Sequence, residues 1–174
     1  MRKNTKIYSL YSGIPEAWWE KAETIFKDPP IKVKKLVAAF DKKKESSEGL
    51  VLYSQYGAEK VLAAILGVGV QPFEIRGLSY PEYFASKFAE SSQDVPEFEG
   101  ARVVFIYDVG DEAAVNTKFS AKILTALVKS LVAGGKWVVL VSDKPFSKFE
   151  EQYELAVKNK VSFPRETIGA DLDI

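Results

Sequence analysis

Residues 54–61, which read Ser-Gln-Tyr-Gly-Ala-Glu-Lys-Val, lie where a phosphate-binding loop is expected, between an apolar run and a stretch with helical spacing. A working loop of this kind reads G-x-x-x-x-G-K-[ST]. Its glycines let backbone N–H groups wrap the phosphates, its lysine reaches them, and its hydroxyl binds Mg²⁺. Lys60 keeps its place here, but Ser54 and Glu59 replace the two glycines. Val61 replaces the hydroxyl residue, so the segment indicates a phosphate-binding architecture more strongly than it indicates the chemistry.

Composition excludes several reaction classes. The 174 residues contain no cysteine and no histidine, so the chain has no disulfide, no thiolate zinc site, no cysteine nucleophile and no imidazole base. Lysine plus arginine and aspartate plus glutamate each number 24, so a contact with DNA must come from a local basic patch. No apolar run has the length of a signal peptide or a membrane span, and we expect a cytoplasmic protein with no membrane partner.

Apolar runs of strand length alternate with helical patterns, which predicts the α/β class: one three-layer domain with a parallel sheet flanked by helices. Strands are expected at residues 50–53, 73–76, 103–107 and 137–141, with a weaker fifth at 167–172. The first, third and fourth are continuous apolar runs, as in strands buried on both faces.

Helices are expected at residues 59–66 and 118–132 and from Ser79 and Pro81 to residue 90. Gly134 and Gly135 would end the second of these helices. Residues 41–48 and 91–100 are rich in polar residues and are expected to be exposed connections.

The order and spacing of these segments resemble the AAA+ ATPases of the DnaC/IstB helicase-loader type over roughly residues 13–150. The matching segments are a lead-in with Ile14-Pro15 and a helix ending at Phe40, a Walker A segment at 49–65, a Walker B strand at 103–110 and a sensor-1 strand at 138–145. The resemblance implies a P-loop NTPase core of AAA+ type at residues 49–174, preceded by a helical lead-in at residues 1–48. It also implies a role in DNA replication or transposition.

Two departures from the family's pattern remove the groups that hold Mg²⁺. The family has two adjacent acidic residues at the end of the Walker B strand, where this chain has Tyr107 and Asp108. Asp108 would keep the catalytic role of positioning water, but the Tyr107 phenol cannot replace a carboxylate around Mg²⁺, which takes hard oxygen ligands. Val61 removes the second ligand, so no metal site is expected. Glu59 places a carboxylate where a glycine should admit the β-phosphate, which opposes binding.

The resemblance assigns nucleotide contacts to Gly57 and Lys60 in the Walker A segment and to Asp143 at the sensor position. The family usually has a serine or threonine followed by asparagine there, and Ser142-Asp143 presents an acceptor-only carboxylate in place of the amide. Arg165 is a candidate for the arginine that such loaders direct at a neighbour's nucleotide. We therefore expect no cofactor or weakly bound ATP or ADP, and no ATP hydrolysis.

Each candidate residue also has a purely structural interpretation. Lys60 can be a helix-surface lysine, and Asp108 can cap the segment that follows its strand. Trp18 and Trp19 can be core residues of an N-terminal helix or an exposed anchor for a protein partner. A run of basic residues can be a solvated face or a patch for DNA phosphates. Its members are Lys32, Lys34, Lys35, Lys42, Lys43 and Lys44.

Two other functions remain open. Residues 131–140 resemble the late strand of class I SAM-dependent methyltransferases. That family needs a glycine-rich first turn to admit the cofactor, and the turn at 54–57 has one glycine and no preceding acidic residue. A structural or inhibitory module that binds an ATPase partner would keep the core and lose the chemistry. The preferred interpretation is a loader-like protein that recognises a protein partner: a replicative helicase, a related ATPase or a second copy of the chain. DNA is a further possible contact.

Overall fold

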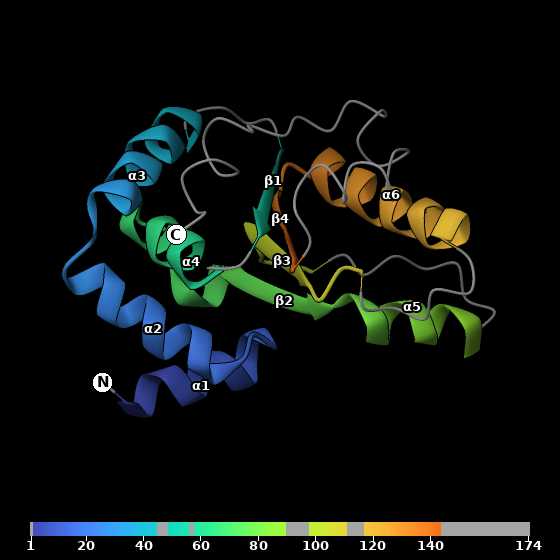
Figure 1. The fold of residues 1–174 in the computed structure, drawn as a ribbon, viewed down its shortest axis with the longest axis horizontal. Helices are drawn as coiled ribbons and strands as arrows, with labels where there is room; N and C mark the ends of the chain where they lie inside the picture. Colours follow the sequence, from blue (N-terminus) through green and yellow to red (C-terminus); the bar gives the residue numbers. More distant parts are fainter. Residues whose placement is uncertain (1, 45–48, 56–57, 90–97, 111–116, 144–174) are drawn as a thin grey trace.

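The structure, a computed structural model, describes residues 2–44, 49–55, 58–89, 98–110 and 117–143 (Figure 1). In this part of the chain the sheet has four parallel strands in the order β1-β4-β3-β2: β1 (Leu50–Gln55), β2 (Ile75–Ser79), β3 (Val103–Tyr107) and β4 (Trp137–Ser142). Helices lie on both faces of the sheet, so the predicted α/β class and its three layers are confirmed (Figure 1).

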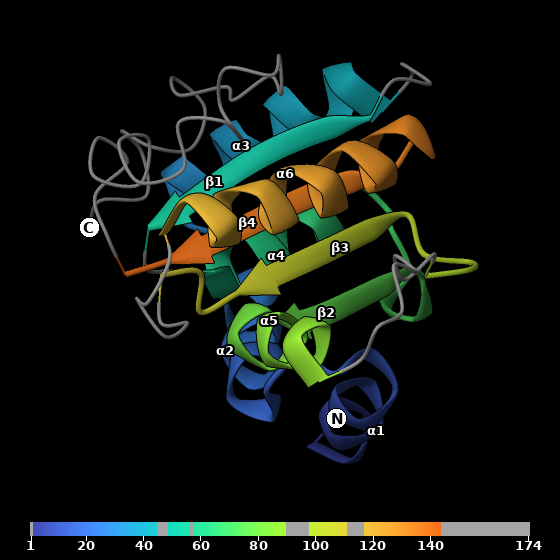
Figure 2. The ribbon, with the colours of Figure 1, turned by 90° about the vertical axis from the view of Figure 1, so that its right-hand side faces the viewer.

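The helices are divided between the two faces by the path of the chain. They are α1 (Arg2–Ser12), α2 (Glu16–Lys27), α3 (Ile31–Lys44), α4 (Ala58–Gly67), the short 3₁₀ helix η1 (Pro72–Glu74), α5 (Tyr80–Ala89) and α6 (Thr117–Ala133). The chain crosses from β1 to β2 at the far edge through α4 and returns to β3 and β4 through α5 and α6. Right-handed crossovers that run in opposite directions place their helices on opposite faces. In Figure 2, α6 accordingly lies in front of the sheet, and α3 and α4 lie behind it.

Alternate side chains of each strand point to opposite faces and build two apolar layers. On β1, Leu50 and Leu52 belong to the layer shared with α2, α3 and α4, whereas Val51 and Tyr53 belong to the layer shared with α5 and α6. Every residue of β4 is buried, as is β3 as far as Ile106. Burial on both faces explains why these strands appear in the sequence as continuous apolar runs.

The two glycines after α6 end the helix as predicted. Gly135 has a φ of +79° and donates its N–H to the Val132 carbonyl at 2.9 Å. The Lys136 N–H bonds the Leu131 carbonyl at 3.2 Å. This pair of bonds is a Schellman motif, which satisfies the last carbonyls of the helix and starts β4 two residues later.

The predicted bounds differ most from the structure at the second strand and at the first connection. The second strand ends at Ser79 instead of residue 76. The second strand begins at Ile75 instead of residue 73, because Pro72 starts a 3₁₀ turn in which the Glu74 carboxylate accepts the Gln71 N–H at 2.8 Å. Residues 41–44 belong to α3 and not to an exposed connection. The remainder of that connection, most of the second predicted connection and the expected fifth strand at 167–172 lie outside the described residues.

The N-terminal helices share the core of the sheet. Trp19 of α2 and Phe40 of α3 are 2% and 1% exposed and belong to the same apolar cluster as α4 and one face of the sheet. Pro29 and Pro30 separate α2 from α3. None of the helices among the described residues is long and apolar enough to cross a membrane.

Candidate functional site

The candidate residues meet at the carboxyl edge of the parallel sheet. Lys60 is in the first turn of α4 after β1, Asp108 follows β3, and Asp143 follows β4. The helix that follows β1 and the helix that follows β3 lie on opposite faces of the sheet (Figure 2). Open α/β sheets bind ligands outside the carboxyl ends of strands that are arranged in this way. Gly57, an expected nucleotide contact like Lys60 and Asp143, lies outside the described residues.

The connection between β1 and α4 is shorter than the motif template predicts. β1 continues to Gln55 and α4 begins at Ala58, so two positions separate strand from helix. Ser54, at the position of the first glycine, is fully buried and in register with Val141 of β4. Among the described residues of this segment, Ser54 and Gln55 are therefore part of the sheet, and Ala58 and Glu59 are part of the helix.

Val61, which the resemblance aligns with the Mg²⁺-binding hydroxyl, is a core residue. It is 0% exposed, and it packs in the layer between the sheet and helices α2 and α3. An apolar side chain in this setting contributes about 1.5–3 kcal/mol of burial free energy. The position now stabilises the fold and offers no oxygen to a metal.

Tyr107, which the resemblance aligns with the first Walker B carboxylate, binds the N-terminal lead-in. Its hydroxyl donates a hydrogen bond to the Gly13 carbonyl at 3.0 Å. Its ring packs edge-on against Trp18 of α2, with 5.4 Å between the ring centroids. Burial raises the pKa of the Tyr107 phenol, and the negative charges of Glu82 and Asp108 raise it further. The phenol therefore stays protonated and keeps its donor role at neutral pH.

Two glycines allow the lead-in to reach Tyr107. Gly13 has a φ of +80°, and a Cβ there would lie 3.0 Å from the Gly77 carbonyl oxygen of β2. A Cβ on Gly77 would lie 2.5 Å from Cγ1 of Ile14, which is fully buried. The backbone between α1 and α2 therefore lies directly on β2, and this contact positions the Gly13 carbonyl for Tyr107.

Glu59, at the position of the second glycine, faces α2. One carboxylate oxygen lies 4.0 Å from the Lys21 Nζ, in an ion pair whose lysine is 69% exposed. Such a pair contributes little to stability, but it gives the carboxylate a neighbour on the lead-in. Lys60 beside it is half-buried.

The turn after β3 is tied to the end of β4. Asp108 is exposed and has a φ of +58°, a left-handed conformation that aspartate tolerates better than most residues. The next residue, Val109, donates its N–H to the Val141 carbonyl at 3.1 Å and accepts a bond from the Ser142 hydroxyl at 2.7 Å. The sensor-position hydroxyl is thus engaged within the protein, while Asp143 beside it is exposed.

Among the described residues, the charges at this edge do not favour a polyphosphate. Carboxylates lie near the carboxyl ends of all four strands, and Lys60 is the cation assigned to phosphate binding; the acidic residues are Glu59, Glu82, Asp108 and Asp143. Like charges about 4 Å apart repel by about 1 kcal/mol in water and by more at a drier site. The described residues also contain no group of three acidic or metal-ligating side chains that could hold a metal ion.

The other candidates fall at different places. Trp19 is a core residue, and its Nε1–H donates to the Ser12 hydroxyl at 3.2 Å. Trp18 is half-buried against Tyr107. Lys42, Lys43 and Lys44 are exposed at the end of α3, but the Lys44 ammonium bonds the Val68 carbonyl just after α4, at 2.8 Å. Arg165 lies outside the described residues.

Sequence reasoning missed the part played by Gly13, Gly77 and Lys21. The signal that could have found them is the tyrosine at position 107, because a large polar ring at the end of a buried strand needs both an apolar wall and a hydrogen-bond acceptor. The acceptor is 94 residues away in the chain.

No protein-family model matches the chain, and a comparison with curated proteins finds no relative. Among solved structures, the chain is similar to domain III of the replication initiation protein DnaA of Thermotoga maritima, with 17% identity and a TM-score of 0.49 over 74% of this chain. It spans 58% of that domain. It is also similar to a candidate primosome component of Streptococcus pyogenes serotype M3, with 15% identity and a TM-score of 0.43 over 85% of this chain and 82% of the other. These identities are too low to carry over an activity.

Proposed function

We propose that the chain is a loader-like protein of AAA+ type whose nucleotide site has been converted into an internal contact, and that it acts by recognising a protein partner in DNA replication or transposition. The observation that carries the proposal is the contact of Tyr107 with Gly13 and Trp18. The position that would organise Mg²⁺ instead holds the N-terminal lead-in against the sheet.

The strand order supports the assignment of the motifs. β4, the strand that resembles the sensor-1 strand, lies between β1 and β3, which resemble the Walker A and Walker B strands. Residues that follow these three neighbouring strands can therefore face one bound phosphate chain. The same order disfavours the methyltransferase alternative, because β1 and β2 lie at opposite edges here and the doubly wound dinucleotide-binding sheet places its second strand beside its first.

Three substitutions act together against the chemistry. Val61 and Tyr107 remove both protein ligands of Mg²⁺, and Glu59 adds a carboxylate where the β-phosphate would enter. Each replacement side chain has a partner of its own: the apolar core, the Gly13 carbonyl and Lys21, respectively. The site has therefore gained structural contacts as well as lost ligands, and this supports a protein that works without ATP hydrolysis.

Partner recognition remains as the function of the fold. The candidate partners are a replicative helicase, a related ATPase and a second copy of the chain, in keeping with the resemblance to loaders. A contact with DNA phosphates through Lys42 and Lys43 is a secondary candidate, since both side chains are exposed at the end of α3.

Phosphate release from Mg-ATP tests the loss of hydrolysis. The wild-type chain is expected to give the same background as Asp108→Asn, a variant that lacks the carboxylate expected to position water. Turnover above that background, abolished by Asp108→Asn, would contradict the proposal. A triple variant, Glu59→Gly with Val61→Thr and Tyr107→Asp, tests whether restoring the three positions restores Mg-ATP binding, with thermal melting as the check that it folds.

A further inference from the structure

The outward face of α1 carries an apolar stripe. Ile7, Leu10 and Tyr11 are 51%, 79% and 52% exposed, and their spacing of three and four residues places them on one side of the helix. The opposite side packs on the protein, where Thr5 and Ser12 are buried. An amphipathic helix normally turns its apolar side inward, so this stripe is available for another molecule.

The 3₁₀ helix η1 extends the stripe with a rigid aromatic surface. Phe73 is 51% exposed and packs edge-on against Tyr8 and Tyr11, with ring centroids 5.7 and 5.2 Å apart. The Arg76 guanidinium lies 4.1 Å above the Tyr11 ring and donates to the Tyr11 hydroxyl and the Phe73 carbonyl, both at 2.6 Å. These contacts hold the rings in place before any partner arrives, which lowers the entropy cost of binding. We call the surface formed by these side chains the α1 face; its members are Ile7, Leu10, Tyr11, Phe73 and Arg76.

A cavity adjoins the α1 face. It has a volume of about 260 Å³ between α1, α2 and the end of α4, and its walls include Tyr8, Trp19, Phe26 and Pro72. Tyr8 touches both the cavity and Phe73 of the α1 face. The cavity is large enough for one big apolar side chain, which would act as the anchor of a docked segment.

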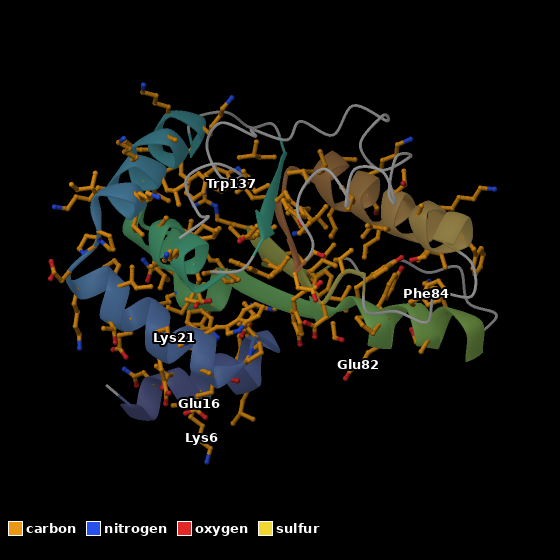
Figure 3. The ribbon with its side chains drawn as sticks, in the orientation of Figure 1. Lys6, Glu16, Lys21, Glu82, Phe84 and Trp137 are labelled. Atoms are coloured by element: carbon orange, nitrogen blue, oxygen red, sulfur yellow. The ribbon has the colours of Figure 1, made fainter. Side chains whose placement is uncertain are left out.

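The charged residues in the sequence of α1 are all basic. They are Arg2, Lys3 and Lys6, and the first acidic residue of the chain is Glu16. Lys6 points away from the body of the molecule in Figure 3. These lysines and the arginine stand at the positive end of the α1 dipole, where carboxylates are favoured. The nearest acidic group on η1, Glu74, accepts the Gln71 N–H, and Glu23 lies across the cavity on α2.

We infer that the α1 face docks an amphipathic helix of a protein partner whose apolar stripe is flanked by carboxylates. The inference rests on the proposed function in one respect, namely that the chain works by contact with a protein. Tyr, Phe and Arg side chains around a cavity suit the insertion of individual side chains, as in helix-in-groove recognition, better than they suit a flat lipid surface. The basic residues of α1 favour a partner helix with carboxylates over one with lysines.

Fluorescence anisotropy with two labelled helical peptides tests the inference. Both peptides are about 18 residues long, or five turns, with leucines at three- and four-residue spacing; one has glutamates on the flanks of the stripe and the other has lysines. The wild-type chain is expected to bind the glutamate peptide at least about tenfold more tightly than the lysine peptide. Leu10→Glu is expected to weaken that binding at least about tenfold.

Ile31→Glu provides the matched control. Ile31 on α3 is 72% exposed, close to the 79% of Leu10, but lies outside the α1 face, so this variant is expected to bind like the wild type. Circular dichroism and thermal melting check that both variants fold. Equal binding of the two peptides, or equal loss in the two variants, would overturn the inference.

Two further outcomes would also overturn it. Binding to anionic phospholipid vesicles that Leu10→Glu abolishes would assign the face to a membrane surface. A dimer in analytical ultracentrifugation that Leu10→Glu dissociates would assign it to a second copy of the chain. The proposed function fails by a different result. If Mg-ATP binds and Lys60→Ala abolishes this binding, the proposed function is rejected and the peptide result still stands. If neither nucleotide nor peptide binds, only the docking surface is rejected.

Discussion

The carboxyl edge of the sheet and the α1 face differ in what their side chains contact. At the carboxyl edge, side chains at positions of nucleotide chemistry have partners inside the molecule: Tyr107 bonds Gly13, and Val61 lies in the core. On the α1 face, side chains that could have been core residues are exposed, with Leu10 at 79%. Under the proposed function, the first region has exchanged nucleotide chemistry for internal contacts, and the second is the surface for recognition.

The largest expected effect comes from separating the lead-in from the sheet. Gly77→Ala places a Cβ 2.5 Å from the buried Ile14 Cγ1, so Ile14 must move and the Tyr107 contact with Gly13 is weakened. Overpacking of this kind costs about 1–3 kcal/mol of unfolding free energy, measurable by urea denaturation. Gly134→Ala, whose nearest neighbour to a Cβ lies 3.3 Å away, is the control and should cost less. Equal stability of Gly77→Ala and wild type would show that the lead-in does not lie on β2.

A smaller effect is expected when only the phenol oxygen is removed. Tyr107→Phe keeps the ring against Trp18 and loses the hydrogen bond to the Gly13 carbonyl. The unfolding free energy should fall by about 0.5–1.5 kcal/mol in urea denaturation. Tyr11→Phe, on the α1 face, removes a hydroxyl that accepts a bond from Arg76, and it should cost less because the Tyr11 side chain is 52% exposed. A larger loss of unfolding free energy in Tyr11→Phe than in Tyr107→Phe would contradict this comparison of the two regions.

The ionisation of Tyr107 gives a pH-dependent prediction. Its folded-state pKa is raised above the ordinary value of 10.0, first by burial and then by Glu82 and Asp108. A raised pKa favours the protonated form in the folded state, so this contribution to stability is complete below pH 10 and is lost as the pH rises through the folded-state pKa. Unfolding free energies measured across this range should fall less steeply in Tyr107→Phe than in the wild type. Identical slopes would contradict the burial of this phenol.

The smallest effect is expected for the ion pair between Lys21 and Glu59. Lys21→Ala removes a lysine that is 69% exposed, and exposed pairs contribute about 0–1 kcal/mol at most. The melting temperature should therefore stay close to that of the wild type. A large drop in melting temperature would mean that Lys21 holds Glu59 in place. The carboxyl edge would then be more tightly bound to α2 than the 4.0 Å between the two charged groups indicates.

The fold was largely predictable because its strands are buried on both faces. β3 was predicted with its observed bounds, since residues 103–107 form an unbroken apolar run with polar neighbours. The end of α6 was predictable from Gly134 and Gly135, because the αL position after a helix favours glycine. The start of β2 was not, since Phe73 has high strand propensity and only the Pro72 turn keeps it out of the sheet.

The site was less predictable because its decisive contacts join distant parts of the chain. The template of a phosphate-binding loop led to an expected loop from residue 54, whereas Ser54 and Gln55 continue β1 and pair with β4. That Tyr107 departs from the motif was visible in the sequence. That its hydroxyl bonds Gly13 could not be seen, because this depends on the close approach of Gly13 to Gly77 across the sheet.

Isothermal titration of ATP and ADP, with and without Mg²⁺, tests the central claim most directly. The account predicts no heat of binding at about 1 mM nucleotide for the wild type, and the same trace for Lys60→Ala, because Glu59, Val61 and Tyr107 oppose the phosphates and Mg²⁺ together. Mg²⁺-dependent binding that Lys60→Ala abolishes would contradict it, and would show that the carboxyl edge of the sheet is still a nucleotide site.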